Sequence, residues 1–296
     1  MLIPLMFVIS LLAFLLVKVA PGGPFDRERS PASAEVERAL NARYHLDEPF
    51  LKQYARYAWG LLRFDFGPSL KYRSHTVNDI IAQGLPVSLA LGALAFCFSI
   101  GLGVPLGIYT ALRRNRWDGY LANLAAVLTF CVPGLVLGPI LIVVFGIWLG
   151  WFPVALWGSV SHTILPTVTL GAFFVGRVAR LTREGMLNVL PSEFITAARA
   201  RGISEFKLVG KHALRTAILP VVSYSGPMMA DLLTGSFVVE NIFQIPGIGV
   251  FLVNSSLSRD YPMVVGLVML YAALLLVLNL LVDLSYSALD PRVKYE

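Results

Sequence analysis

The chain has 296 residues, of which 56% are hydrophobic and only 14% are charged, with a net charge of +6. Soluble domains contain about 25% charged residues, so this composition excludes an ordinary soluble protein and predicts a multi-pass membrane protein. Outside the first long loop, the basic residues concentrate at the ends of apolar runs. That distribution indicates a positive-inside bias and argues against nucleic-acid binding.

Six apolar runs are expected to cross the bilayer. In chain order they are Leu2–Val19, 86–112, 121–149, 164–179 (the core of the fourth), 217–239 and 263–284. The first run is about long enough to span, so we expect a membrane helix and not a cleavable signal peptide. Pro133, Gly134 and Pro139 are expected to kink or loosen the third.

A long mixed-charge region, 21–84, separates the first two spans and contains amphipathic stretches at 34–44 and 49–62. Long loops are exempt from the positive-inside rule, so its basic residues are compatible with an extracytoplasmic location. Two interpretations stay open for this region: a docking surface for a substrate-binding protein, or a lid that packs on the helices.

The sequence contains few candidates for chemistry of its own. The two cysteines, Cys97 and Cys131, fall in apolar runs, and we expect buried core thiols there. The four histidines lack metal-ligand spacing, so no metal site and no catalytic residue is predicted. There is no Gly-x-x-x-x-Gly-Lys-Ser/Thr loop, so the chain itself should not bind ATP.

The longest polar interruption of the second half, 192–220, lies between two spans. Five basic residues face two acidic ones there: Arg199, Arg201, Lys207, Lys211 and Arg215 against Glu193 and Glu205. Ser192 is a good helix N-cap. The pattern predicts a basic helix that docks onto a cytoplasmic partner; the alternative is an ordinary positive-inside loop.

This stretch resembles the EAA loop of permease subunits of ATP-binding cassette (ABC) importers. Ala197, Ala198 and Gly202 fit its Ala-Ala-x-x-x-Gly core. Thr196 stands where the general motif has a glutamate, so the carboxylate role is absent or is taken by Glu193 or Glu205. The longer match is to the oligopeptide/dipeptide group and consists of Phe194, Ile195, Ala198, Arg199, Ala200, Gly202, His212, Ala213, Leu214, Arg215, Leu219 and Pro220.

Further stretches similar to the same group extend the resemblance over nearly the whole chain. They are 44–49 (YHLDEP), 65–69 (DFGPS) and 290–292 (DPR). Among these permeases, the chain is most similar to the B-type subunit of the oligopeptide importers.

The resemblance implies an all-α membrane protein with the type I ABC importer permease fold: six transmembrane helices and a long extracytoplasmic loop region after the first. The implied division is a first helix (1–20), the loop region (21–84), a five-helix core (85–285) with the coupling loop 182–216, and a cytoplasmic tail (286–296). The implied location is the bacterial cytoplasmic (inner) membrane, with both termini in the cytoplasm.

The implied function is translocation of oligopeptides, with no cofactor in this chain. The implied partners are a second homologous permease subunit, two cytoplasmic ATPase subunits that bind ATP and Mg²⁺, and an extracytoplasmic peptide-binding protein. An importer of the same architecture for dipeptides, glutathione, nickel or opines stays open. An ion-coupled secondary transporter is less favoured, because the sequence contains no internal repeat.

The resemblance also implies roles for two groups of residues. The ATPase-coupling residues would be Glu193, Thr196, Ala197, Ala198, Arg199, Gly202, Glu205 and Lys207. An extracytoplasmic gate or receptor contact would be formed by Glu240, Pro246, Gly247 and Gly249, with a purely structural turn as the alternative. 

Asp231 lies inside an apolar run, where an ionisable group is costly. It is expected either to line the substrate pathway, to make a structural hydrogen bond to a neighbouring helix, or to lie near the membrane interface. Ser223, Tyr224 and Ser225 of the same run are candidates for the pathway wall, and ordinary helix packing is the alternative.

Overall fold

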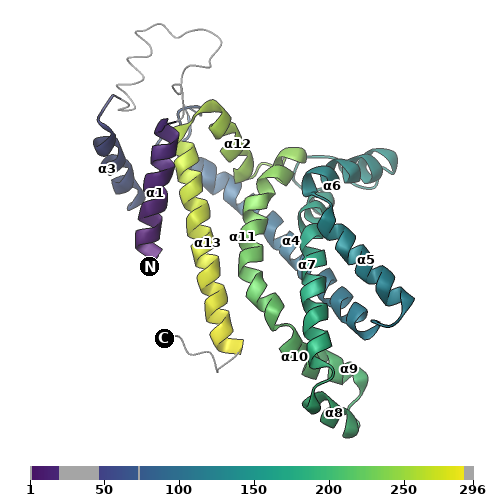
Figure 1. The fold of residues 1–296 in the computed structure, drawn as a ribbon. Helices are drawn as coiled ribbons and strands as arrows, with labels where there is room; N and C mark the ends of the chain where they lie inside the picture. The colour runs from purple at the N-terminus through teal and green to yellow at the C-terminus, as the bar shows by residue number, and fades with distance from the viewer. Residues whose placement is uncertain (1, 20–46, 73, 290–296) are drawn as a thin grey trace. The chain divides into compact units, whose positions relative to one another are not determined.

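The computed structural model describes residues 2–19, 47–72 and 74–289, which are almost entirely helical (Figure 1). An isolated β-bridge joins Pro68 and Thr76. No strand occurs among the residues that the structure describes. Two compact units form: residues 1–88 with 246–276, and residues 89–245 with 277–296. The expected amphipathic stretch 34–44 and the 290–292 motif lie outside the described residues.

The first unit contains α1, α3, the start of α4, α12 and most of α13. Their bounds are α1 Leu2–Val19, α3 Phe50–Leu61, α4 Val77–Leu112, α12 Ile248–Ser258 and α13 Tyr261–Leu289. α1 packs on α3 (Figure 1), where the ring of Phe14 contacts the rings of Phe50, Tyr54 and Tyr57. The core around α4, α12 and α13 is apolar and comprises Val77, Ile80, Ile81, Ile248, Met263 and Leu267.

α4 begins at Val77 and not at residue 86, where the apolar run begins. Thr76 and Asp79 form a reciprocal cap at this start: Thr76 N donates to Asp79 Oδ2 (2.8 Å), and Asp79 N donates to Thr76 Oγ1 (3.2 Å). The cap lets the helix begin within a polar stretch, because the first orphan amides are satisfied by side chains.

The second unit contains the rest of α4 and the following helices up to α11. Their bounds are α5 Trp117–Cys131, α6 Gly134–Leu141, the π-helix η1 Ile142–Trp148, α7 Val160–Val189, α8 Glu193–Ala200, α9 Glu205–Lys207, the π-helix η2 Leu208–Ala213, α10 Leu214–Ala217 and α11 Leu219–Ile242. α7 packs against α4 and α5 through glycines. A Cβ at Gly107 of α4 would meet Thr182, and one at Gly176 of α7 would meet the backbone of Ala126.

Three described helices are long and apolar enough to cross a membrane: Val77–Leu112, Val160–Val189 and Tyr261–Leu281. A fourth crossing is possible if the bent pair Trp117–Cys131 and Gly134–Trp148 forms one broken span. Within α1, the stretch Pro4–Leu16 counts as a shorter apolar helix. All six expected runs contain helix, and the coarse prediction of a helical membrane protein is confirmed.

The third expected span consists of two helical pieces that are interrupted at Pro133. α5 and the α6–η1 pair meet at an angle of 104°. Val132, which precedes Pro133, has extended backbone (φ −90°, ψ 115°), because the proline ring disfavours a helical conformation in the residue before it. Pro139 by contrast sits inside α6.

The prediction of buried thiols was wrong within the chain. Cys97 and Cys131 are both free and exposed. An apolar helix can direct such side chains outward when its surroundings are lipid, because burial inside the chain is then not needed to remove them from water.

Candidate functional site

The polar stretch after α7 folds into a compact group of short helices, α8, α9, η2 and α10, at the end of α7 (Figure 1). Ser192 precedes α8 with extended backbone, as predicted for a cap. Its hydroxyl, however, donates to the Val189 carbonyl (2.6 Å) and accepts no hydrogen bond from the amides of α8, so the side chain does not cap the helix. Glu193 occupies the first turn of α8, where a negative charge is favourable.

A tight turn separates α8 from α9, and Gly202 makes it. Gly202 has φ +77°, a left-handed conformation that favours glycine. Across this turn Arg199 Nε donates to Glu205 Oε1 (2.6 Å) and Arg199 Nη2 to Oε2 (3.3 Å). The hydrogen bond from Arg199 lowers the pKa of Glu205 below its ordinary value. Glu205 is therefore engaged within the segment, and Glu193 is the exposed carboxylate nearer to Thr196.

The inner side of this segment is an apolar cluster. Ile195, Leu208, Ala213 and Ala217 are buried there, together with Ala111 of α4 and Met186 of α7. A Cβ on Gly185 of α7 would collide with the backbone of Ala217 in α10, so these two helices approach closely. The segment is thereby fixed to the ends of α4 and α7.

The outer side carries most of the predicted coupling residues. Seven of the eight are exposed and Ala198 is half-buried; the exposed ones are Glu193, Thr196, Ala197, Arg199, Gly202, Glu205 and Lys207. Two aromatic side chains accompany them, Phe206 at 89% exposure and Phe194 at 49%. Phe206 had no place in the sequence prediction; its position one residue after Glu205, within the loop, was the available signal.

The predicted pathway residues lie on α11. Ser223 Oγ donates to the Leu219 carbonyl (2.8 Å) and Ser225 Oγ to the Val222 carbonyl (2.6 Å), so both hydroxyls bond within their own helix. The ring of Tyr224 lies 4.6 Å from the guanidinium carbon of Arg177 on α7. Asp231 is exposed on the same helix, and its role in a pathway stays a prediction.

The predicted gate residues fall into both units. In the second unit Glu240 is fully buried and accepts a hydrogen bond from Ser236 Oγ (2.9 Å). In the first unit Pro246 is exposed, whereas Gly247 and Gly249 are buried. The turn at Pro246 leads into α12, as predicted, and the Ile248 amide donates to Ser88 Oγ of α4 (2.9 Å). Gate and receptor roles stay predictions.

A buried carboxylate that the sequence reading passed over organises the first unit. Asp260 accepts hydrogen bonds from Ser69 Oγ and from the amides of Leu70 (3.1 Å) and Lys71 (3.2 Å). Its negative charge also adds to the effect of burial, which raises the pKa of Tyr72. We call these residues, 69–72 with Asp260, the Asp260 latch. Its position just before α13 was a capping signal, but its partners lie about 190 residues away in sequence.

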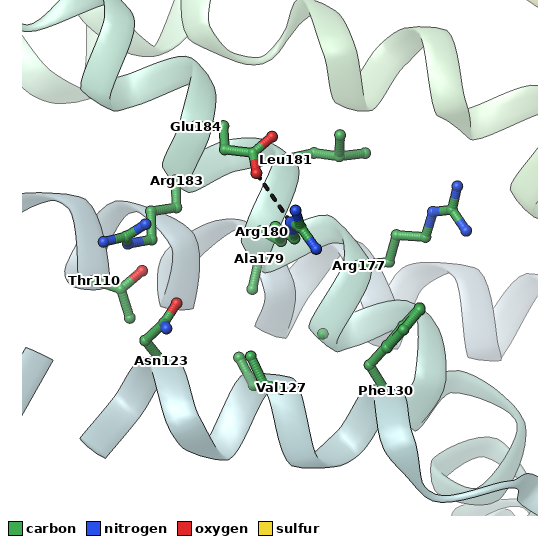
Figure 2. A pocket seen from close by; sticks show the side chains of 12 residues that line it. Thr110, Asn123, Val127, Phe130, Arg177, Ala179, Arg180, Leu181, Arg183 and Glu184 are labelled. Carbon is green, nitrogen blue, oxygen red and sulfur yellow. Dashed lines mark hydrogen bonds and ion pairs between the residues drawn. The ribbon is translucent and has the colours of Figure 1, made fainter. Parts of the chain in front are cut away.

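Within residues 2–19, 47–72 and 74–289, no group of three or more His, Cys, Asp or Glu side chains could hold a metal ion. A cavity of about 640 Å³ lies between α4, α5 and α7 and is lined in part by Arg177, Arg180 and Arg183 (Figure 2).

Comparison with known proteins gives consistent relatives. The family profile described as the inner membrane component of binding-protein-dependent transport systems matches residues 103–295. The dipeptide transport system permease protein DppB of Bacillus subtilis is 45% identical over 97% of this chain and 93% of its own length. The oligopeptide transport system permease proteins OppB of Haemophilus influenzae and Escherichia coli K12 are 42% and 41% identical, each over 99% of this chain and 96% of their own length.

The solved structures add the fold. A chain of the inward-facing MetNI methionine ABC transporter superposes with a TM-score of 0.60 at 18% identity, covering 71% of this chain and 96% of that one. This similarity shows the fold, whereas the family is established by the profile match and by the long match to the DppB and OppB proteins. The chain therefore belongs to the inner membrane components of binding-protein-dependent transport systems, within the group of oligopeptide and dipeptide permease subunits.

Proposed function

We propose that this chain is the transmembrane permease subunit of an ABC importer that moves oligopeptides across the bacterial cytoplasmic membrane. The observation that carries the proposal is the segment after α7: an exposed outer surface mounted on a buried apolar cluster at the ends of α4 and α7. Such a surface suits a cytoplasmic ATPase subunit, because the partner can bind the exposed aromatic side chains while the buried apolar cluster holds the segment in place.

The proposed mechanism follows from the packing of this segment on α4 and α7. Phe194 and Phe206 would contact the ATPase, with the small side chain of Ala197 allowing close approach. Because Ile195 and Leu208 are buried beside Met186 of α7, a displacement of the outer surface is passed to α7. The work comes from ATP and Mg²⁺ bound by the partner subunits, which bind ATP with different affinity in the two states of the transporter.

The topology and partners belong to the same proposal. We expect six crossings, with α1 and the 24-residue α11 included, both termini in the cytoplasm and the region 21–84 outside. A second permease subunit of similar fold would complete the pathway, with Asp231 facing it, and a peptide-binding protein would deliver the cargo. 

The cargo rests on relatives whose names include both dipeptide and oligopeptide transport. A dipeptide importer is therefore the second candidate. Glutathione, nickel and opines remain alternatives of the same architecture, and an ion-coupled secondary transporter remains the alternative from another class.

The test is co-expression of this chain with its candidate partners, purification in mild detergent, and measurement of ATP hydrolysis with and without peptide and binding protein. We expect two ATPase subunits and a second permease to co-purify, with hydrolysis stimulated by peptide. Phe206→Ala should reduce recovery of the ATPase subunits at unchanged thermal stability, because the side chain is 89% exposed.

Trp148→Ala is the matched control, since Trp148 is also an exposed aromatic residue, at 76%, but lies outside the segment. It should leave ATPase recovery unchanged. Purification of a chain without any ATPase subunit, together with uptake that follows an ion gradient, would replace the importer by a secondary transporter. Stimulation by dipeptides alone would select the second candidate.

A further inference from the structure

The cavity between α4, α5 and α7 is not explained by coupling or by a substrate pathway. Its volume is about 640 Å³. Figure 2 shows Arg183, Thr110 and Asn123 at one end and Arg177 and Phe130 at the other. The antiparallel packing of α5 on α7 produces this order, because Gly176 lies against Ala126 and Phe130.

Three arginines of α7 line the cavity, and two of them are already engaged. Arg177 lies over the ring of Tyr224, and Arg180 pairs with Glu184 at 2.9 Å. Arg183 is half-buried, and its Nε is buried without a hydrogen-bond partner among the described residues. A buried donor on a cation is costly when it is unsatisfied, so this end of the cavity is suited to an anion.

The cavity's polar end lies close to the end of the helices. Thr110 is three residues before Arg113, where α4 gives way to a short basic connection, Arg113–Arg116, and α5 starts at Trp117. Trp117 and Tyr120 are exposed at 75% and 67%. Exposed aromatic and basic residues at a helix end are typical of the level of the lipid headgroups.

The other part of the cavity is apolar and continues onto an apolar surface of α5. Val127 and Phe130 line the cavity and are themselves exposed at 45% and 43%, beside the exposed Leu124 and Leu128. A ligand that fits would therefore combine a negative charge at one end with hydrocarbon at the other. A free phosphate matches only the first requirement.

We propose that this cavity binds an anionic phospholipid, with its phosphate accepting hydrogen bonds from Arg183 and Asn123 and one acyl chain lying along α5 at Val127 and Phe130. The Thr110 hydroxyl donates to the Gly107 carbonyl, so it can only accept from the ligand, as from a glycerol hydroxyl of the headgroup. The bound lipid satisfies the guanidinium of Arg183 and fills the space between α5 and α7.

The experiment uses the full-length chain in mild detergent and native mass spectrometry, with three probes: dioctanoyl phosphatidylglycerol, dioctanoyl phosphatidylcholine and inorganic phosphate. We expect the phosphatidylglycerol to bind at least about tenfold more tightly than the phosphatidylcholine, with Arg183→Ala removing this preference. Arg114→Ala is the matched control, since Arg114 is an exposed arginine of the neighbouring connection and does not line the cavity.

A second variant separates the lipid from a free phosphate and guards against misfolding of Arg183→Ala. Val127→Trp fills the apolar part and leaves the arginines in place; because Val127 is partly exposed, the larger ring is tolerated. It should weaken phosphatidylglycerol binding about tenfold and leave phosphate binding unchanged.

Equal binding of the two lipids by the unmodified chain would overturn the proposal. So would full phosphatidylglycerol preference in Arg183→Ala. Inorganic phosphate binding as tightly as phosphatidylglycerol, with both unaffected by Val127→Trp, would identify a free phosphate as the ligand and reject the lipid. None of these readouts depends on peptide transport, so they stand apart from the test of the proposed function.

Discussion

Two segments outside the long helices are held to the protein in opposite ways. In the first unit, residues 69–72 are held by a buried carboxylate, Asp260, which accepts three hydrogen bonds from them. In the second unit, residues 193–217 from α8 to α10, the proposed coupling segment, are held by apolar packing on Ala111 and Met186, while the ion pair of Arg199 with Glu205 lies at the surface.

The difference shows that hydrogen bonds to a buried charge set the position of one segment, whereas apolar packing attaches the other. Hydrogen bonds to a buried charge are directional, and each donor left without its acceptor is penalised. Apolar burial is non-directional and tolerates small shifts. The Asp260 latch therefore fixes a loop in one register through directed bonds, whereas the coupling segment is attached through apolar contacts and close approach of the backbone to α7.

The largest effect should come from removing the latch. Asp260→Ala leaves the Ser69 hydroxyl and the amides of Leu70 and Lys71 without their acceptor, and we expect a loss of about 4 kcal/mol of unfolding free energy. The measurement is thermal or denaturant unfolding of the full chain in detergent. Asp47→Ala, at an exposed carboxylate, is the control and should have no effect. Equal unfolding free energies of the two variants would contradict a stabilising role of the Asp260 latch.

The next effect concerns the approach of α7 to the coupling segment. Gly185→Ala places a methyl group against the Ala217 backbone, and we expect a loss of about 2 kcal/mol. Gly210→Ala, in η2, is the matched substitution, because a methyl group there meets no atom within 4 Å. It should be neutral or stabilising by up to about 1 kcal/mol. Similar unfolding midpoints for the two variants would contradict the close approach.

A smaller effect is expected at the turn after α8. Gly202 has φ +77° and open space around it, so strain and not collision is the cost of a side chain. Gly202→Val should lose about 1–2 kcal/mol, and Gly202→Asn clearly less, since asparagine tolerates the left-handed region. Unfolding of both variants under the same conditions decides; a Val variant as stable as the Asn variant would refute the strain.

The smallest effect should come from the ion pair. Glu205→Gln removes a pair in which both side chains are largely exposed, 49% and 61%, so stability at neutral pH should hardly change. Because the pKa of Glu205 is lowered in the folded chain, the stabilisation is present above its ordinary value of 4.5 and is lost as the pH falls through the folded value. Unfolding at pH 7 and at pH 4, with and without the substitution, measures this; a large loss at pH 7 would contradict the comparison.

Local features of the fold could be predicted from the sequence. The apolar run predicted the bounds of α1, Leu2–Val19, and α8 begins after Ser192 as expected. The start of α4 at Val77 was missed although its cap, Thr76 with Asp79, is a local signal. The boundary was predicted from hydropathy alone, and hydropathy does not detect a helix that begins in a polar stretch.

Features that depend on distant partners could not be predicted. Asp260 and Ser69 are far apart in sequence, so nothing local indicates that they meet. The cation–π contact of Arg177 with Tyr224 depends on how α7 packs on α11. Pro133 indicated a disturbance in the third span, but a proline alone does not set the angle between the two helices, which is 104° here.

The break between α5 and α6 also has a consequence for the order of synthesis. α5 has 15 residues and α6 with η1 another 15, about 22 Å each, so each piece is shorter than the hydrocarbon core of about 30 Å. α6 rests on helices made after it: Gly138 lies against Thr169 of α7 and Ile242 of α11. A nascent chain that ends before α11 therefore lacks one of the two helices on which α6 packs. The non-helical backbone at Val132 and Pro133 is shielded from lipid only after the later helices have been made.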